Sequence, residues 1–483
     1  MVAKMRATYD PPRLKRNAIG IFGSYAQAMA VTAPLGSVVS SLAAGAIFAG
    51  ANLPLVTFFA FLTSVLWIFL LTSFSKKINS AGGFYTYTSN SIGPKAGYLE
   101  AITEFLAFLF TTVFEGMYVG IIVPSLLSQF GVHLPTWSWI PLTMIGVGLA
   151  IPFTYLDVAK ALTKYVAVGA TLEVIVLFGL SLYLIISAGY HNTLAVFTDL
   201  KLAPRGVAGL STGYLLAVIS IAGAGTATYL GEETKTPSKT VTRGMWLALL
   251  LGGSSMLLSS YALVVAWGIA NASTLGSANA PIVQLAARVS TLLAVALVLL
   301  AVNSLLVSNV GTNISASRIL FSLAREKGAP QLFSKVHERH KTPYVAAFFV
   351  GAISLALALS TPLLMGFLNA YEMFAVAASF CWILGRIGDS ISLPFFYLKN
   401  FREEFSVLKH VMPSFGITLV NLIGLGLSIV PLSYPSDVSI ALVTIVMLSW
   451  ITAFVASKRR TDMIGAYLVN DEGELVIKKS SFR

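Results

Sequence analysis

Apolar residues occur along this chain in long stretches that are separated by short polar segments. A helix that crosses the roughly 30 Å hydrocarbon core of a bilayer needs about 20 mainly apolar residues, and its backbone hydrogen bonds are satisfied internally. The pattern therefore predicts an all-α polytopic membrane protein with twelve transmembrane helices. The predicted spans are residues 17–49, 53–74, 95–127, 137–156, 162–188, 207–231, 242–270, 287–325, 343–360, 364–398, 414–433 and 437–457.

Two of the predicted spans are interrupted near their middle. The first contains Thr32-Ala33-Pro34-Leu35-Gly36-Ser37, and the sixth contains Ala222-Gly223-Ala224-Gly225-Thr226. Unwound backbone at membrane depth is tolerated only against protein or a water-filled cavity, and paired interruptions in two halves of a chain point to a transporter binding site. Proline and glycine also occur in membrane helices simply as kinks or close-packing positions. The pairing of the first span with the sixth favours the binding site.

Composition agrees with a membrane protein. Of the 483 residues, 56% are hydrophobic and only 11% are charged, whereas soluble domains carry about 25% charged residues. The charge is basic, with 32 Lys and Arg against 20 Asp and Glu. An ordinary soluble enzyme is therefore excluded, and lipid is the expected surrounding of most of the chain.

The positive charges lie on one side of the twelve-span pattern, and the opposite side carries little beyond Lys201 and Arg205. The positive-inside rule then predicts a multi-pass protein of the cytoplasmic (plasma) membrane with both termini in the cytoplasm. Dispersal of the cations over loops disfavours nucleic-acid binding. The basic segments are residues 1–16, 76–95, 160–164, 235–243, 318–341, 399–409 and 458–460.

Other chemistry is sparse. Cys381 is the single cysteine, so no intramolecular disulfide or cysteine-based metal site can form. The five histidines show no ligand spacing, no phosphate-binding loop follows a strand, and no nucleophile and base converge. We therefore expect no metal, no cofactor and no enzymatic activity. The basic N-terminus precedes an apolar stretch too long for a signal peptide, which predicts a retained first span.

Three stretches together resemble the amino acid, polyamine and organocation transporter superfamily, in particular its amino acid permeases. Gly223–Pro237 (GAGTATYLGEETKTP) is similar to the signature of the sixth span of that family. Ala81–Pro94 (AGGFYTYTSNSIGP) resembles its loop between spans two and three. Ser317–Pro330 (SRILFSLAREKGAP), followed by Lys341–Pro343, resembles its loop between spans eight and nine. These matches cover most of residues 17–400.

The resemblance implies a leucine-transporter-type fold in which two inverted repeats of five spans surround a central site. It also implies secondary active transport of amino acids by alternating access, often as symport with protons. The substrate carboxylate would meet backbone N–H groups around Pro34 to Ser37, and its amino group would meet carbonyls around Thr32 and Ala222 to Gly225. The implied domains are a basic N-terminus (1–16), two repeats (17–188 and 207–398), two further spans (414–457) and a cytoplasmic tail (461–483).

The chain departs from the family pattern at both breaks. Relatives often carry Gly-Ser-Gly in the first span, where this chain has Ala33-Pro34-Leu35-Gly36-Ser37. They often carry Gly-Phe-Glu in the sixth span, where this chain has Gly223-Ala224-Gly225. Loss of the aromatic residue widens the expected pocket or moves its gate, so the substrate cannot be inferred from relatives.

Ionisable residues inside a membrane span are costly unless they are paired or hydrated, so each is a functional candidate. Glu173 in the fifth span is the leading candidate for coupling, where some proton-coupled relatives carry a lysine; a hydrogen-bonded structural role is the alternative. Glu115 and Glu372 fall in the outer parts of their spans and would favour cationic substrates if both faced the cavity, with interhelical hydrogen bonding as the alternative.

Further polar positions share helix faces. Arg386 and Asp389 are three residues apart, which predicts an internal ion pair. Glu232 and Glu233 end the sixth span beside Lys235 and predict a salt bridge at an inner gate. Glu100 and Glu104 are expected to serve as gate or packing partners. Ser304, Ser308, Thr312 and Ser315 form one small polar face, and Ser308 and Thr312 are the candidates for completing a cation site, unless this face only permits close packing.

The tail 461–483 contains Tyr467–Ile477, which reads as two short strands around an Asn-Asp-Glu-Gly turn; a disordered tail is the alternative.

The expected partners are an amino acid substrate, a proton or sodium ion for coupling, and the lipid bilayer. The leading hypothesis is a proton-coupled amino acid symporter. An exchanger, a carrier of polyamines or other cations, and a transporter-like amino acid sensor are the alternatives.

Overall fold

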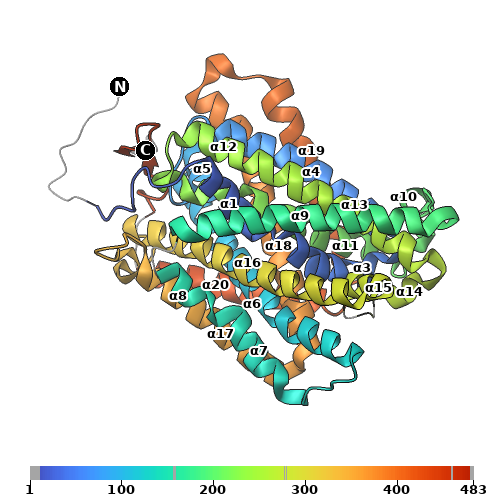
Figure 1. The fold of residues 1–483 in the computed structure, drawn as a ribbon. Coiled ribbons are helices and arrows are strands. Elements are labelled where there is room, and N and C mark those ends of the chain that lie inside the picture. The colour runs from blue at the N-terminus through green and yellow to red at the C-terminus, as the bar shows by residue number, and fades with distance from the viewer. Residues whose placement is uncertain (1–10, 156–158, 277, 279, 458–460, 479–483) are drawn as a thin grey trace.

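The computed structural model describes residues 11–155, 159–276, 278, 280–457 and 461–478, and it is a bundle of long helices (Figure 1). Part of the expected basic N-terminus, including Lys4 and Arg6, and the segment 458–460 lie outside the described residues. Within them, eleven segments are long and apolar enough to cross a membrane. The prediction of an all-α polytopic membrane protein is confirmed.

The first of these segments, Ile21–Ser75, is 55 residues long and contains the first two predicted spans. It divides at Gly50, whose φ of +55° breaks the helix. The number of twelve crossings and the two inverted repeats stay predictions. In the first half of the chain the helices are α1 Ile21–Thr32, α2 Pro34–Ser37, η1 Val38–Leu42, α3 Ala43–Ala49, η2 Gly50–Asn52, α4 Leu53–Ser75, α5 Phe84–Ser91, α6 Pro94–Gln129, η3 Thr136–Ser138, α7 Trp139–Gly148, α8 Ala150–Tyr155 and α9 Ala159–Ala188.

The second half contains the other broken span and the longest helices after α6. Its helices are η4 Gly189–His191, α10 Ala195–Thr198, η5 Leu200–Leu202, α11 Gly206–Ala222, η6 Gly223–Glu233, α12 Pro237–Ala248, η7 Leu249–Gly253, α13 Ser254–Trp267, η8 Ile269–Asn271, α14 Ala272–Leu275, α15 Pro281–Val289, α16 Thr291–Arg325, η9 Gln331–Ser334, α17 Tyr344–Met365, α18 Phe367–Asn400, η10 Arg402–Glu404, η11 Val407–Val411, α19 Met412–Ser428 and α20 Ser436–Ala456.

Burial separates the central helices from the peripheral ones. The most apolar part of α6 is 94% buried, whereas that of α20 is 11% buried. Large apolar side chains such as Leu364 and Leu408 are exposed on the outer surface. An apolar outer surface over so many helices is the surface that a lipid bilayer covers. α6 is therefore positioned at the centre of the bundle, against α16 and α18.

The two expected strands are present as β1 Tyr467–Val469 and β2 Leu475–Ile477, which pair antiparallel. This hairpin packs on one end of the bundle, near α5 and α12 (Figure 1). Val469 N donates to Asn79 O at 2.8 Å. The Asp471 carboxylate accepts from both Ser238 N and Ser238 Oγ. We call this end of the molecule the hairpin end.

Candidate functional site

The break in the first span is a single residue between two helices. α1 ends at Thr32, Ala33 adopts a left-handed conformation with φ 40° and ψ 68°, and α2 begins at Pro34. A left-handed residue other than glycine is strained, and proline is suited to the first position of a helix because it needs no N–H partner there. The chain therefore exposes the N-terminus of α2 inside the bundle, at the predicted position.

The sixth span changes helix type at its predicted break. α11 ends at Ala222, and the next eleven residues form the 3₁₀-helix η6. Such helices rarely exceed about four residues because their hydrogen bonds are poorer, and a long one often marks a hinge. The two breaks touch: a Cβ built on Gly223 would lie 2.1 Å from Thr32 N. Thr226 Oγ1 also donates to Gln27 O at 3.3 Å.

Glu173 from α9 meets the N-terminus of α2. Its Oε2 accepts from Leu35 N at 3.3 Å and from Ser304 Oγ at 2.7 Å. The same Ser304 hydroxyl oxygen accepts from Gly36 N at 3.1 Å. The first amides of a helix lack internal partners and carry a partial positive charge, so a carboxylate is stabilised there. The protein's own carboxylate therefore caps the half-helix that was predicted to bind the substrate carboxylate.

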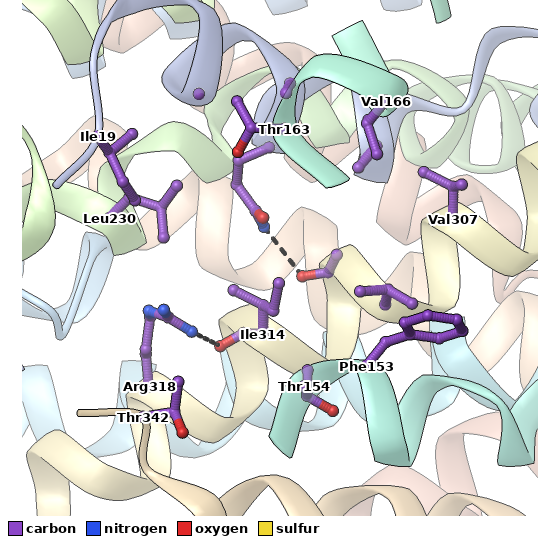
Figure 2. Close-up of a pocket in the computed structure, with 16 residues that line it drawn as sticks. Ile19, Phe153, Thr154, Thr163, Val166, Leu230, Val307, Ile314, Arg318 and Thr342 are labelled. Carbon is purple, nitrogen blue, oxygen red and sulfur yellow. Dashed lines mark hydrogen bonds between the residues drawn. The ribbon is translucent and has the colours of Figure 1, made fainter. Parts of the chain in front are cut away.

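Two adjoining cavities lead to this carboxylate. One has an empty volume of about 730 Å³ and lies between α1, α8, α9, η6 and α16, with Arg318 at one end (Figure 2). The other, of about 230 Å³, is lined by Glu173 and Ser304. They share Ala30, Val166 and Val307. Gln27 also lines the larger cavity and donates to Gly311 O at 3.0 Å and to Ser315 Oγ at 3.2 Å.

Two buried ion pairs close the bundle between the larger cavity and the hairpin end. Glu233 pairs with Arg318 at 2.6 Å, and Glu232 pairs with Arg325 at 2.9 Å. We call these four residues the gate pairs. Lys235, the neighbour in sequence, is exposed and is not a partner of either carboxylate. The expected salt bridge is present, but its cations are Arg318 and Arg325 and not the neighbouring Lys235.

The other polar positions of α16 divide between two neighbours. Ser304 faces α2 and α9, as described above. Thr312 Oγ1 hydrogen-bonds with Thr112 Oγ1 of α6 at 2.7 Å. Ser308 Oγ is buried near Glu115, which is also on α6, and has no hydrogen-bond partner there. Glu173 is therefore not brought together with Ser308 and Thr312. Ser304 was visible in the sequence as part of the same polar face, but spacing alone did not distinguish it from its neighbours.

Glu115 and Glu372 do not line the cavities that reach Glu173. Glu115 is buried between α6 and α16, and its Oε2 has no partner. Glu372 on α18 is partly exposed, with Arg205 as the nearby cation. A joint acidic entrance for cationic substrates is therefore not formed by these two side chains in this conformation.

The expected ion pair between Arg386 and Asp389 is wrong. Arg386 Nη1 donates to Ser64 Oγ at 3.0 Å, and its guanidinium lies 4.3 Å from the centre of the Trp67 ring. Asp389 Oδ2 instead accepts from Trp67 Nε1 at 3.0 Å. Trp67 stands between the two charges because it offers a π face to the cation and an N–H to the anion.

Broken helices that meet beside a buried, capped half-helix within a multi-pass bundle are typical of membrane transporters. The chain belongs to the amino acid permease family, which it matches over residues 23–463. It is 23% identical over 320 residues to the low-affinity putrescine importer PlaP of Escherichia coli, covering 65% of this chain and 69% of that protein. It is 24% identical over 360 residues to the branched-chain amino acid permease BcaP of Bacillus subtilis, covering 69% and 74%. It is 27% identical over 308 residues to the gamma-aminobutyric acid permease of Escherichia coli, covering 62% and 63%.

Proposed function

We propose that this protein carries amino acids across the cytoplasmic membrane by alternating access, as a symporter driven by protons, with both termini in the cytoplasm. The proposal is carried by the contact between Glu173 and the N-terminus of α2. Family membership and relatives that are named as permeases for amino acids support the substrate class.

The coupling step follows from competition between two carboxylates. Ionised Glu173 occupies the N–H of Leu35 and, through Ser304, engages the N–H of Gly36. A proton on Glu173 removes its charge and weakens these contacts, which releases the helix N-terminus for the carboxylate of an amino acid. The amino group then meets carbonyls near Thr32 and at the start of η6. Substrate and proton bind together for two reasons. Protonation of Glu173 frees the amides for the substrate carboxylate, and a substrate carboxylate on those amides no longer lets them stabilise ionised Glu173.

The gate pairs close the route to the cytoplasm in this proposal. The larger cavity ends at Arg318, whose partner Glu233 closes η6 (Figure 2). Separation of Arg318 from Glu233 and of Arg325 from Glu232 would let η6 and α16 part and release substrate on that side. Because all four side chains are almost fully buried, opening requires that they be hydrated together.

A carrier of organic cations is the second candidate. The same capped N-terminus favours it, since a substrate without a carboxylate does not need the amides that Glu173 occupies, and an amine can bind Glu173 directly. A relative named as a putrescine importer is consistent with this candidate.

The test is uptake into proteoliposomes with labelled amino acids and labelled putrescine, with proton and sodium gradients imposed separately. Accumulation of an amino acid that follows the proton gradient is the expected result. Exchange that ignores both gradients would reject symport, and uptake of putrescine alone would favour the second candidate. Deletion of residues 461–483 completes the test, because a carrier retains uptake without the hairpin, whereas a sensor that signals through the tail loses signalling.

A further inference from the structure

Three carboxyl groups gather inside the bundle, apart from the cavities that reach Glu173. Glu100 and Glu104 lie one turn apart on α6, and Asp389 comes from α18. All three are almost fully buried, with 6%, 3% and 0% exposure. Glu104 and Asp389 line a small cavity together with Arg386 and Trp67. The transport step proposed above uses none of these side chains.

Few donors serve these carboxyl groups. Tyr229 Oη of η6 donates to Glu104 Oε2 at 2.7 Å, and Trp67 Nε1 donates to Asp389 Oδ2. Both oxygens of Glu100, Oε1 of Glu104 and Oδ1 of Asp389 have no hydrogen-bond partner among the described residues. Buried polar atoms are nearly always paired, so these four oxygens require a donor that the protein itself does not supply.

The charges do not balance either. Arg386 is the cation beside the cluster, and its Nε and Nη2 also lack partners. Three ionised carboxylates against one guanidinium would leave two negative charges uncompensated in a buried site. Each such charge costs several kcal/mol, so the fully ionised cluster is not a stable state of the folded protein.

Glu100 lies against the part of α18 that carries Asp389, and the two carboxyl groups are close enough to interact electrostatically. The Glu100 carboxyl fills a space left by a glycine of α18, since a Cβ built on Gly388 would lie 3.1 Å from both Cδ and Oε1. Two such carboxyl groups can hydrogen-bond only when a proton lies between them, because two ionised carboxylates offer acceptors alone.

We propose that Glu100, Glu104 and Asp389 form a proton-binding site between α4, α6, η6 and α18, in which Glu100 and Asp389 share a proton at neutral pH. The other titratable or charged groups that face the cluster are Arg386, Tyr229 and Tyr87 of α5. Thr88 of α5 also faces Glu100, but it hydrogen-bonds with Ser392 at 2.8 Å. Among the described residues, no group of three or more His, Cys, Asp or Glu side chains is arranged to hold a metal ion.

The site is connected to the sixth span at two points. Tyr229 lies in η6 between the break and the gate pairs, and its hydroxyl is tied to Glu104. Trp67 reaches the break itself, because a Cβ built on Gly225 would lie 2.5 Å from Trp67 Cη2. Loss of the proton therefore places additional negative charge directly against the segment that joins the substrate site to the gate.

Infrared spectroscopy of the purified full-length protein tests the proposal without transport, so a failure of symport and a failure of this site are distinguishable. Protonated carboxyl groups have a carbonyl stretching band that carboxylates lack, and it shifts on exchange into D₂O. The wild type should show this band at neutral pH. Glu100→Gln and Asp389→Asn should each remove a component of it, whereas Glu338→Gln, at an exposed position, should leave it unchanged.

Three outcomes would overturn the proposal. A wild-type spectrum with no band at neutral pH shows that the cluster is ionised, and this result does not depend on whether any variant folds. Loss of the band at constant pH when choline chloride is replaced by sodium chloride would show that the site takes a sodium ion in place of the proton. Persistence of the full band in Glu100→Gln, Glu104→Gln and Asp389→Asn would assign it to other carboxyl groups.

Discussion

Glu173 and Leu35 lie 138 residues apart in the sequence, yet the carboxylate of one accepts the backbone N–H of the other at 3.3 Å. The contact is possible because Ala33 interrupts the first span and leaves the amides of α2 without partners inside their own helix. It places a titratable group on the backbone that a substrate carboxylate would use. The predictions about transport follow from this contact.

Glu173→Gln should remove the response of uptake to an imposed proton gradient. Glutamine can still accept from Leu35 N, but it cannot change charge, so substrate and proton are no longer linked. A hydrogen bond to a charged group contributes about 1.5–3 kcal/mol, which predicts roughly a ten- to hundred-fold loss of gradient-driven accumulation. Glu403→Gln, at an exposed position, is the matched control. Unchanged gradient dependence in Glu173→Gln would contradict the coupling role.

Ser304→Ala and Ser308→Ala distinguish two hydroxyl groups that lie one turn apart on α16. Ser304 joins Glu173 to Gly36, whereas Ser308 has no hydrogen-bond partner. We expect Ser304→Ala to strengthen substrate binding by about 1–3 kcal/mol, because Gly36 N loses the protein partner that competes with the substrate carboxylate and is left buried without one until substrate binds. Binding measured by substrate-induced thermal stabilisation gives the comparison. A larger effect of Ser308→Ala would favour the cation site that was predicted from the sequence.

Glu233→Gln should open the cavity toward the hairpin end. Arg318 would remain buried opposite a neutral partner, and removal of one member of a buried ion pair costs about 3–5 kcal/mol. The measurement is the rate at which a thiol reagent labels a cysteine introduced at Ile314, which lines the cavity; Cys381 is fully buried. We expect labelling to accelerate at least about tenfold, which corresponds to 1.4 kcal/mol.

Lys235→Gln is the control for this experiment. Lys235 is exposed and adjacent in sequence to Glu233, but it takes no part in the gate pairs. Equal acceleration in Lys235→Gln and Glu233→Gln would show that general charge at this end, and not the buried pair, holds the gate closed.

Gly223→Ala should destabilise the protein because the added methyl group would meet the backbone of Thr32. Overpacking of this kind costs about 1–3 kcal/mol, and here it also separates the two breaks. Gly179→Ala is the matched change within α9, where a Cβ would meet nothing within 4 Å and a gain of about 0.5–1 kcal/mol is expected. Thermal unfolding in detergent compares the two. Equal stability of both variants would indicate that the breaks are not in close contact.

Glu326, at the hairpin end, should make the stability of the folded protein depend on pH. It follows α16 directly, accepts from Tyr85 Oη at 3.0 Å, and lies close to the backbone of Gly465 and Tyr467. Burial raises the pKa of its carboxyl from 4.5 to about 7. Because the folded pKa is raised, the folded state binds more protons than the unfolded state between these values. Stability should therefore fall by about 3 kcal/mol as the pH rises from about 4.5 to 7.

Glu326→Gln should flatten this part of the stability curve, because glutamine can accept from Tyr85 without a charge. Thermal unfolding of the wild type and the variant across the pH range is the measurement. The hairpin should also resist proteolysis more strongly in the variant at alkaline pH. An identical slope for both proteins would show that Glu326 does not carry the dependence.

Local features of the sequence were sufficient for the membrane spans, the two breaks and the hairpin. Apolar length predicts a span because lipid offers no hydrogen bonds to the backbone, so a helix must follow. Pro34 interrupts the first span through its own backbone chemistry, and the glycines at 223 and 225 mark the second break in the sequence, although the close approach of Gly223 to Thr32 is visible only in the structure. Two short apolar runs around the Asn-Asp-Glu-Gly turn in 467–477 predicted the two strands in the same way.

Partners between helices were not predictable in this way. The pairing of Glu233 with Arg318, and the position of Trp67 between Arg386 and Asp389, join segments that are far apart in the chain. Helical periodicity predicts which residues share a face, but it does not predict which neighbouring helix that face contacts. Ser304 and Thr312 are eight residues apart on α16 and differ by about 80° in direction, which was enough to turn Ser304 toward Glu173 and Thr312 toward α6.

The sequence by itself therefore determined that this chain is a helical membrane protein with two broken spans and an acidic residue, Glu173, within the fifth. Only the tertiary structure decided that Glu173 caps α2, that Ser304 completes this contact, and that Glu100 meets Asp389. The physical reason is that backbone breaks and apolar length are local properties. The role of a buried charge depends instead on the donor that the packing of distant helices places beside it.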